Sequence, residues 1–259
     1  MVVCPAMQRL FYVSKILNFM EKDTKLLLIP GGFGTGSFLS KNYNINDFLE
    51  LNQLPYVTRF DGEKLDLYYR LKKFWFGSNL DHNDYSVILN KFFKADFNKV
   101  KSVQEAEFFY WNMILHPPIM IGNEEKIKQG IRFKFYREGI TLKVLEYMTQ
   151  LDEERILVGK ELGYNLVPIK DYLSGDYSGL TSLESALLND EATGEVFAPN
   201  TLNHRYLTED IHYGLVPLSE LAKSCGVNTP MINYLIKRTN NILNVDFYKG
   251  GFNQKIKNE

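Results

Sequence analysis

The sequence is poor in cysteine and in long apolar runs, and each shortage excludes a class of protein. Only two of its 259 residues are cysteine, Cys4 and Cys225, and their separation excludes a disulfide framework and metal-type spacing. No apolar run approaches the roughly 20 residues that span a bilayer. The N-terminus also lacks the basic region and long apolar core of a signal peptide. We therefore expect a cytoplasmic protein with no bound metal and no membrane partner.

An excess of charge of either sign is also missing. Lysine and arginine number 30 and aspartate and glutamate 31, so the formal net charge is −1. Nucleic-acid binding requires a concentration of basic residues, whereas here they tend to alternate with acids, as in Glu124–Lys128. The composition therefore argues against a nucleic-acid partner. The apolar share of 45% is ordinary for a globular protein of one large or two modest domains.

The first hundred residues carry the pattern of a parallel sheet. Residues 1–6 resemble the end of a buried strand, and residues 8–20 have helical spacing of their apolar side chains. The continuous apolar run Leu26–Ile29 is typical of a strand buried on both faces. Strand, helix and strand in this order predict a parallel crossover unit. Further strands are expected from Leu65 to Tyr69 and from Leu71 to Phe76, and a short helix over 85–93.

The rest of the chain has helical patterning. Glycine and proline punctuate it, and it contains no internal repeat. The helices are expected over 104–115, 139–162, 180–189, 217–225 and 229–243. The predicted fold class is therefore α/β followed by all-α. A partial Rossmann-like nucleotide-binding domain would span residues 1–102, and an all-helical substrate domain residues 103–259.

A glycine-rich segment, Pro30–Ser37, follows the predicted strand at Leu26–Ile29. A dinucleotide-binding turn requires G-x-G-x-x-G at the first strand, but the sixth position counted from Gly32 is Ser37, and a strand and a helix precede it. The segment is better explained as a later loop at the carboxyl edge of the sheet. Such a loop could touch one end of a dinucleotide without holding its phosphates.

Two distant segments carry residues suited to acid–base chemistry. His116 precedes Pro117-Pro118, which is expected to stop a helix, and Arg205 and Asp210 lie in one short run. A histidine, whose ordinary pKa is about 6.5, can exchange a proton near neutral pH, and a carboxylate can fix its tautomer. A guanidinium can bind a carboxylate through two donors. The structural alternatives are a histidine at a helix end, a capping aspartate and an arginine in a salt bridge.

In this order, the segments resemble the octopine/nopaline dehydrogenase family, the opine dehydrogenases. Residues 50–59 are similar to its E-T-Q-T-L-P-Y-x-x-R segment, with Leu51, Asn52 and Gln53 departing. The other similar stretches are Val2–Ala6 with Leu28–Gly31, Asn112–Pro118 (N-x-x-x-H-P-P), Phe135–Gly139 (F-Y-x-E-G), and Arg205–Asp210 with Tyr213–Pro217 (R-Y-L-T-E-D-x-x-Y-G-L-V-P). Each motif alone is weak, but five in the same order are specific.

The resemblance implies a reductive condensation. An amino acid and a 2-oxo acid would form an imine, which NADH or NADPH would reduce, in a cleft between a nucleotide-binding and a helical domain. By motif position, His116 is the acid/base, Asp210 its carboxylate partner and Arg205 a ligand of the substrate carboxylate. Further expected contacts are Asn112 and Glu50 with the substrate, and Pro5, Ala6, Pro30 and Gly31 with the cofactor.

The family also begins with a strand, a G-x-G-x-x-G/A turn and a helix that this sequence does not show. We expect roughly 60–90 residues of the first nucleotide-binding half to be absent, which leaves NAD and NADP undistinguished. The chain could then be such a dehydrogenase with a later start or half of a split enzyme, working as a homodimer or with a complementing N-terminal polypeptide. It could instead be an inactive relative that acts at most as a binding or oligomerisation module. A ketopantoate or glycerol-3-phosphate reductase is disfavoured because those families lack the Arg205–Asp210 run.

Overall fold

The computed structural model describes residues 1–21, 24–45, 48–60, 62–78, 85–174, 182–189 and 193–249. The chain divides into two units, Met1–Tyr110 and Trp111–Glu259. The boundary predicted between residues 102 and 103 lies one short helix earlier. That helix, α4 (Val103–Glu107), belongs to the first unit because it packs on strands β3 and β6 of the sheet.

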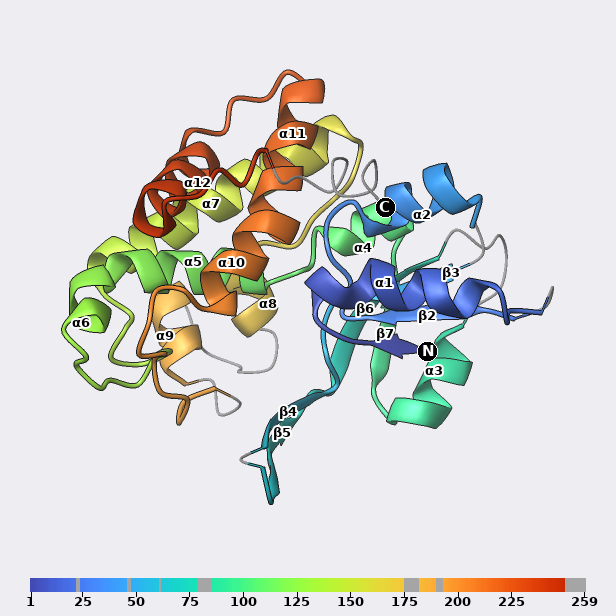
Figure 1. Cartoon of the computed structure of the whole chain (residues 1–259), viewed down its shortest axis with the longest axis horizontal. Coiled ribbons are helices and arrows are strands. Elements are labelled where there is room, and N and C mark those ends of the chain that lie inside the picture. Colours follow the sequence, from blue (N-terminus) through green and yellow to red (C-terminus); the bar gives the residue numbers. More distant parts are fainter. Residues whose placement is uncertain are drawn as a thin grey trace. The chain divides into compact units, whose positions relative to one another are not determined.

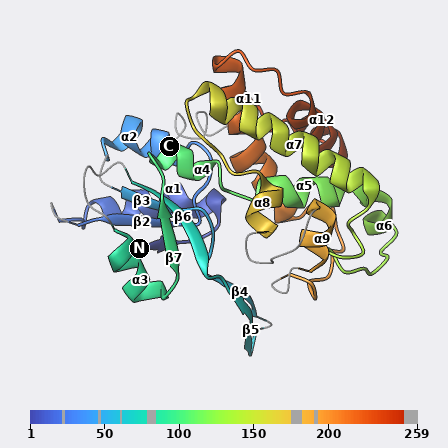
Figure 2. The same ribbon diagram turned by 180° about the vertical axis from the view of Figure 1, so that it is seen from behind.

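A five-stranded sheet with the order β1-β2-β3-β6-β7 forms the centre of the first unit (Figure 1). The first three strands are parallel, β6 is antiparallel to β3, and β7 is parallel to β6. Helix α1 (Ala6–Leu17) joins β1 to β2 and covers one face of the sheet, which confirms the predicted crossover unit (Figures 1 and 2). The strands are β1 (Val2–Val3), β2 (Leu26–Ile29), β3 (Phe48–Leu51), β6 (Lys73–Ser78) and β7 (Asp96–Lys99).

The remaining elements of this unit are two helices and a hairpin. Helix α2 (Thr35–Tyr43) follows the glycine-rich segment, and α3 (Ser86–Phe93) confirms the short helix expected there. Within the described residues, strands β4 (Tyr56–Phe60) and β5 (Leu65–Arg70) pair only with each other, and they project from the sheet in both views (Figures 1 and 2). The strand expected at Leu65 is therefore present, but outside the main sheet.

Two buried carboxyl groups hold the glycine-rich loop between β2 and α2. Glu50 on β3 accepts a hydrogen bond from the Gly32 N–H at 2.6 Å. Glu107 on α4 accepts one from the Gly36 N–H at 3.1 Å, and a further backbone bond comes from Gly34. Gly34 and Gly36 stand at the N-terminus of α2, where free N–H groups favour an anion. The protein's own carboxyl groups therefore already accept from these N–H groups.

Arg9 of α1 completes this cluster. Its guanidinium donates to the Pro30 carbonyl at 2.6 Å and to the Thr35 hydroxyl at 2.5 Å, and it is almost fully buried. Burial raises the pKa of Glu50 to about 7, although Arg9 and the Gly32 N–H act in the opposite direction. Burial and the neighbouring Glu50 carboxylate raise the pKa of Glu107 well above its ordinary value of 4.5. One positive charge thus faces two carboxyl groups that retain protons more strongly than usual.

The second unit is helical, as predicted (Figure 1). Outside the helices, the described residues of this unit show one isolated bridge, between Lys134 and Phe197. The helices are α5 (Asn112–Gly122), α6 (Glu124–Lys128), α7 (Leu142–Glu161), α8 (Ile169–Ser174), α9 (Leu183–Leu188), α10 (Arg205–Asp210), η1 (Ile211–Leu215), α11 (Val216–Ser224) and α12 (Pro230–Leu243). Residues 180 and 181 of the helix expected over 180–189 lie outside the described residues. In the part of the chain that is described, no helix has the length and apolar character needed to cross a membrane.

The prediction that Pro117-Pro118 stops a helix is wrong. Helix α5 continues through both prolines to Gly122, and the expected helix over 104–115 is instead broken between α4 and α5. Each internal proline costs about 3 kcal/mol. Complete burial of an apolar side chain stabilises by about 1.5–3 kcal/mol, and α5 buries Met113, Ile114, Ile119 and Met120 completely. Tertiary packing therefore outweighs the local preference.

A continuous helical run extends from Arg205 to Ser224. Its last part, α11, confirms the helix expected over 217–225, whereas the sequence pattern did not predict α10 and η1. His204 begins the run, since its side chain accepts the Tyr206 N–H at 3.3 Å. The middle of the run, η1, is a π-helix, immediately before the turn that contains Pro217. Proline cannot donate the hydrogen bond that an uninterrupted α-helix would require there, and a π-segment changes the bonding pattern at this point.

Gly214 lets η1 approach α5 very closely. A Cβ atom at this position would lie 2.8 Å from the Cβ of Met113, closer than two such atoms normally come. Met113 is completely buried on α5, three residues before His116. The small residue therefore sets the distance between α5 and the segment that includes Asp210.

The buried carboxyl pair predicts a pH dependence for the first unit. A raised folded-state pKa means that stability is present at low pH and is lost as pH rises through that pKa. The free energy of unfolding should fall between about pH 5 and pH 8, and Glu107→Gln should make the fall shallower, since the amide still accepts the Gly36 N–H. Urea unfolding, with amide exchange of residues 26–51, measures this. Glu63→Gln, at an exposed position, is the control. If the unfolding free energy falls with pH equally steeply in Glu107→Gln and in the unaltered protein, the buried carboxyl pair does not cause the pH dependence.

Gly214→Ala should destabilise the second unit. Helix propensity alone would make this substitution stabilising by about 1 kcal/mol. The contact with Met113 should reverse the sign and give a loss of about 1–3 kcal/mol, typical of an overpacked core. Chemical unfolding followed by circular dichroism measures the difference. A more stable Gly214→Ala variant would show that the close approach is absent.

Candidate active site

The structure brings together the two residues that the sequence pairs for acid–base chemistry. His116 lies in the middle of α5 and Asp210 at the end of α10, two helices that pack against each other. The Nδ1 atom of His116 is 2.6 Å from Oδ2 of Asp210. The two residues are 5% and 2% exposed. A carboxylate can only accept, so the geometry places a hydrogen on Nδ1.

The other ring nitrogen of His116 faces Tyr136. Its Nε2 atom is 2.5 Å from the tyrosine hydroxyl. A phenol can either donate to a neutral imidazole or accept from an imidazolium, so this contact fits both charge states. Tyr136 belongs to the F-Y-x-E-G stretch, but the resemblance implies no role for it, and helical or strand periodicity gives no signal for it.

The Phe135–Gly139 segment forms the turn that carries Tyr136. The Lys134 N–H donates to Glu138 Oε2 at 2.5 Å, and the Phe135 N–H donates to the Val196 carbonyl at 2.8 Å. Asn123, at the end of α5, donates to the Gly139 carbonyl at 2.8 Å. The turn is therefore fastened to the helix that carries His116.

Aromatic rings surround the imidazole. Tyr206 stacks on it with ring centroids 3.9 Å apart and 24° between the planes, and Phe135 lies on the same cluster. Tyr206 stands in the Arg205–Asp210 run, but its residue type and position alone predict no function for it. The stacking holds the ring plane while Asp210 and Tyr136 hold its two nitrogens.

Arg205 and Asn112 lie near this cluster along the chain. Arg205 begins α10, next to Tyr206, and its side chain is half-exposed. Its Nε is 3.3 Å from Glu209 Oε2, an ion pair within one helical turn, as in the structural alternative. Asn112 is half-buried and stands one turn before His116 on α5, a spacing that puts both on one side of the helix.

The other predicted site residues belong to the first unit. Pro5 and Ala6 follow β1, and Pro30 and Gly31 follow β2, at the same carboxyl edge of two adjacent parallel strands. Glu50 is completely buried, and its carboxyl group bonds to the glycine loop. Because Glu50 exposes no surface, the predicted direct contact between Glu50 and the substrate has no support in the structure and stays a prediction.

The carboxyl edge fits a phosphate-bearing cofactor only in part. Pro5 provides no side-chain cap for α1, whose first turn contains no acid, so this helix end is favourable for an anionic group. The Gly32 and Gly36 N–H groups, in contrast, already bind carboxyl groups. The glycine loop therefore does not fit a pyrophosphate cradle, in agreement with the sequence.

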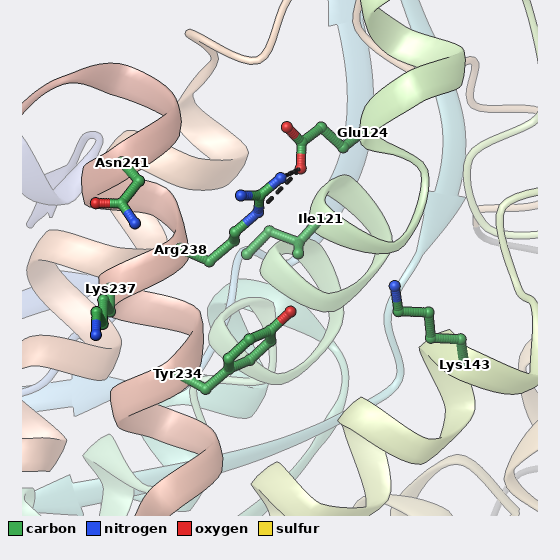
Figure 3. A pocket seen from close by; sticks show the side chains of 7 residues that line it. All are labelled: Ile121, Glu124, Lys143, Tyr234, Lys237, Arg238 and Asn241. Atoms are coloured by element: carbon green, nitrogen blue, oxygen red, sulfur yellow. Dashed lines mark hydrogen bonds and ion pairs between the residues drawn. The ribbon is translucent and has the colours of Figure 1, made fainter.

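A pocket of about 400 Å³ lies in the second unit (Figure 3). It is lined from α5, α6, α7 and α12, and Arg238 reaches across to Glu124, with Nη2 at 2.5 Å. None of the predicted site residues lines it. Among the described residues, no group of histidine, cysteine and acidic side chains could hold a metal ion. The His116 cluster remains the candidate active site.

Comparison with known proteins shows the family of this chain. Residues 99–243 match the alpha-helical domain of the NAD/NADP octopine/nopaline dehydrogenases. An opine dehydrogenase of Arthrobacter sp. is 30% identical over 153 residues, which cover 59% of this chain and 43% of that protein. Vitopine synthase of Allorhizobium ampelinum is 26% identical over 246 residues, which cover 92% of this chain and 68% of the synthase. The chain thus spans less than half of the first relative in this match.

Solved structures show the same fold. Octopine dehydrogenase with NADH and L-arginine is similar with a TM-score of 0.77 at 18% identity, over 93% of this chain and 68% of that one. Yersinopine dehydrogenase with NADP+ is similar with a TM-score of 0.72 at 16% identity, over 96% and 72%. The fold, the buried His116–Asp210 pair and the match over more than half of the residues lead to one conclusion. The chain belongs to the NAD/NADP octopine/nopaline dehydrogenase family.

Proposed function

We propose that this protein is an opine dehydrogenase that condenses an amino acid with a 2-oxo acid and reduces the product with NADH or NADPH. The observation that carries the proposal is the 2.6 Å contact between His116 and Asp210, inside the segment that matches the family. The similar octopine dehydrogenase has been solved with NADH and L-arginine and with NADH and pyruvate, and yersinopine dehydrogenase with NADP+. These ligands suggest the substrate classes to test.

The reaction needs a group that both accepts and donates protons. The amine must lose a proton to attack the carbonyl carbon, and the resulting carbinolamine must gain one to release water as the imine forms. The His116 ring can do both, because Asp210 stabilises the imidazolium that appears between the two steps. A reduced nicotinamide cofactor would supply the hydride.

Two further residues are proposed to bind substrate. The Arg205 guanidinium can bind a carboxylate through two parallel hydrogen bonds, and its half-exposed position leaves it accessible. Asn112 lies on the same side of α5 as His116 and offers an amide donor and acceptor. Pro5, Ala6, Pro30 and Gly31 are proposed to contact the cofactor at the sheet edge.

The test combines activity with binding. The chain is incubated with NADH or NADPH, a panel of amino acids and either pyruvate or a longer 2-oxo acid. Loss of reduced-nicotinamide absorbance and a secondary-amine product in the mass spectrum would support the proposal. If the chain shows no turnover and binds no cofactor at millimolar concentration, the result would favour an inactive relative that serves as a binding or oligomerisation module.

Asp210→Asn is the sharper probe of the catalytic pair. The amide keeps the shape of the side chain but cannot stabilise an imidazolium, and it can reverse the ring tautomer. Turnover should fall by about 10²-fold or more, and His116→Ala should show a similar loss. Steady-state rates at saturating substrate measure this. Glu220→Gln, at an exposed acid on α11, is the control, and turnover retained in both site variants would refute the pair.

Arg205→Ala should weaken substrate binding more than chemistry. Loss of a charge-assisted bidentate contact is worth about 1.5–3 kcal/mol, or roughly 10- to 100-fold in KM for the carboxylate substrate. Arg205→Lys should recover part of the affinity, since it keeps the charge but not the planar pair of donors. Initial rates across substrate concentrations measure the effect. An unchanged KM in Arg205→Ala would leave the residue with only its ion pair to Glu209.

A further inference from the structure

Both nitrogens of the catalytic imidazole are occupied by protein groups. Asp210 binds Nδ1 at 2.6 Å and Tyr136 binds Nε2 at 2.5 Å, so neither nitrogen offers a substrate an open position. The proposed function gives His116 a proton to exchange but assigns nothing to Tyr136. Either the substrate displaces the phenol, or the proton passes through it.

Displacement would require a well-anchored arrangement to move. The imidazole is 5% exposed, lies within α5 beside two prolines and stacks on Tyr206 at 3.9 Å. The turn that carries Tyr136 is fastened at the Lys134 N–H, the Phe135 N–H and the Gly139 carbonyl. Because His116 and Tyr136 are both held in place, proton transfer through the existing hydrogen bonds needs a smaller rearrangement than displacement of the phenol by the substrate.

We propose that Tyr136 ends a proton relay, Asp210–His116–Tyr136, and that its hydroxyl is the group that meets the reacting substrate. This inference rests on the proposed function. A phenol suits the role because the same oxygen donates to neutral imidazole and accepts from imidazolium. His116 can then change charge without rotating, and Asp210 stays bonded to Nδ1 throughout.

The proton balance closes in both steps. The amine begins as an ammonium group, which gives one proton to the Tyr136 oxygen while the Tyr136 proton moves to His116 Nε2. The amine nitrogen then bonds to the carbonyl carbon, and a second N–H proton passes to the carbonyl oxygen, which becomes the carbinolamine hydroxyl. As the carbinolamine C–O bond breaks, the leaving oxygen takes the Tyr136 proton and departs as water. The Tyr136 oxygen then recovers the proton from Nε2. Neither step changes an oxidation state.

Tyr136→Phe tests the relay because it removes only the hydroxyl. We expect turnover to fall by about 10²-fold with KM little changed, and the pH dependence of kcat to differ from that of the unaltered chain. Tyr234→Phe is the matched control, since its hydroxyl bonds to Tyr147 in the same unit, away from the site. Unchanged turnover and pH profile in Tyr136→Phe would overturn the relay, because His116 would then serve the substrate directly.

A spectroscopic readout separates this inference from the proposed function. In long-range ¹H–¹⁵N spectra, Tyr136→Phe should shift the His116 Nε2 signal while the Nδ1 signal keeps its bonded position. Unchanged ring signals would overturn the relay whether or not the chain turns over. Absence of turnover in the unaltered chain would overturn the proposed function alone. If Tyr136→Phe does not fold, 3-fluorotyrosine at position 136 replaces it: a more acidic phenol should move the kcat profile to lower pH, and an unmoved profile would overturn the relay.

Discussion

The contact between the His116 ring and the Asp210 carboxylate is the constraint on which the second unit depends. Removing the partner of a buried charge costs about 3–5 kcal/mol, so each residue needs the other to remain inside the fold. Their elements must therefore stay in contact. Helix α5, helix α10 and the Tyr136 turn form one cooperative assembly, with the imidazole at its centre.

Local irregularities gather around this assembly. Two prolines lie inside α5, a π-segment follows Asp210, and Gly214 allows a backbone approach that a side chain would block. Each feature opposes the regular helical preference of its segment, and burial of α5 outweighs the cost. Departures from local rules are expected where function rather than stability sets the geometry.

The sequence predicted the pairing of His116 with Asp210 better than it predicted their surroundings. Motif positions paired these two residues, which lie 2.6 Å apart, and apolar periodicity located α1, β2, α7 and α12. It failed where distant packing decides the outcome: the continuation of α5 through Pro117 depends on burial that no local pattern reveals. The roles of Tyr136 and Glu107 also depend on contacts that no local pattern reveals. Tyr136 bonds to a residue 20 positions away, and Glu107 bonds to a loop residue 71 positions away. Spacing shows which faces of a helix are apolar, but not which faces meet.

The π-segment lets the chain hold one extra residue between Asp210 and Pro217 without turning either flanking helix. Deleting Ile211 or His212 would restore ordinary α-helical bonding, and because a π-turn holds one more residue for nearly the same rotation, α10 would keep its orientation against α11. Homologues that are one residue shorter in this interval would therefore be expected to retain the imidazole–carboxylate pairing.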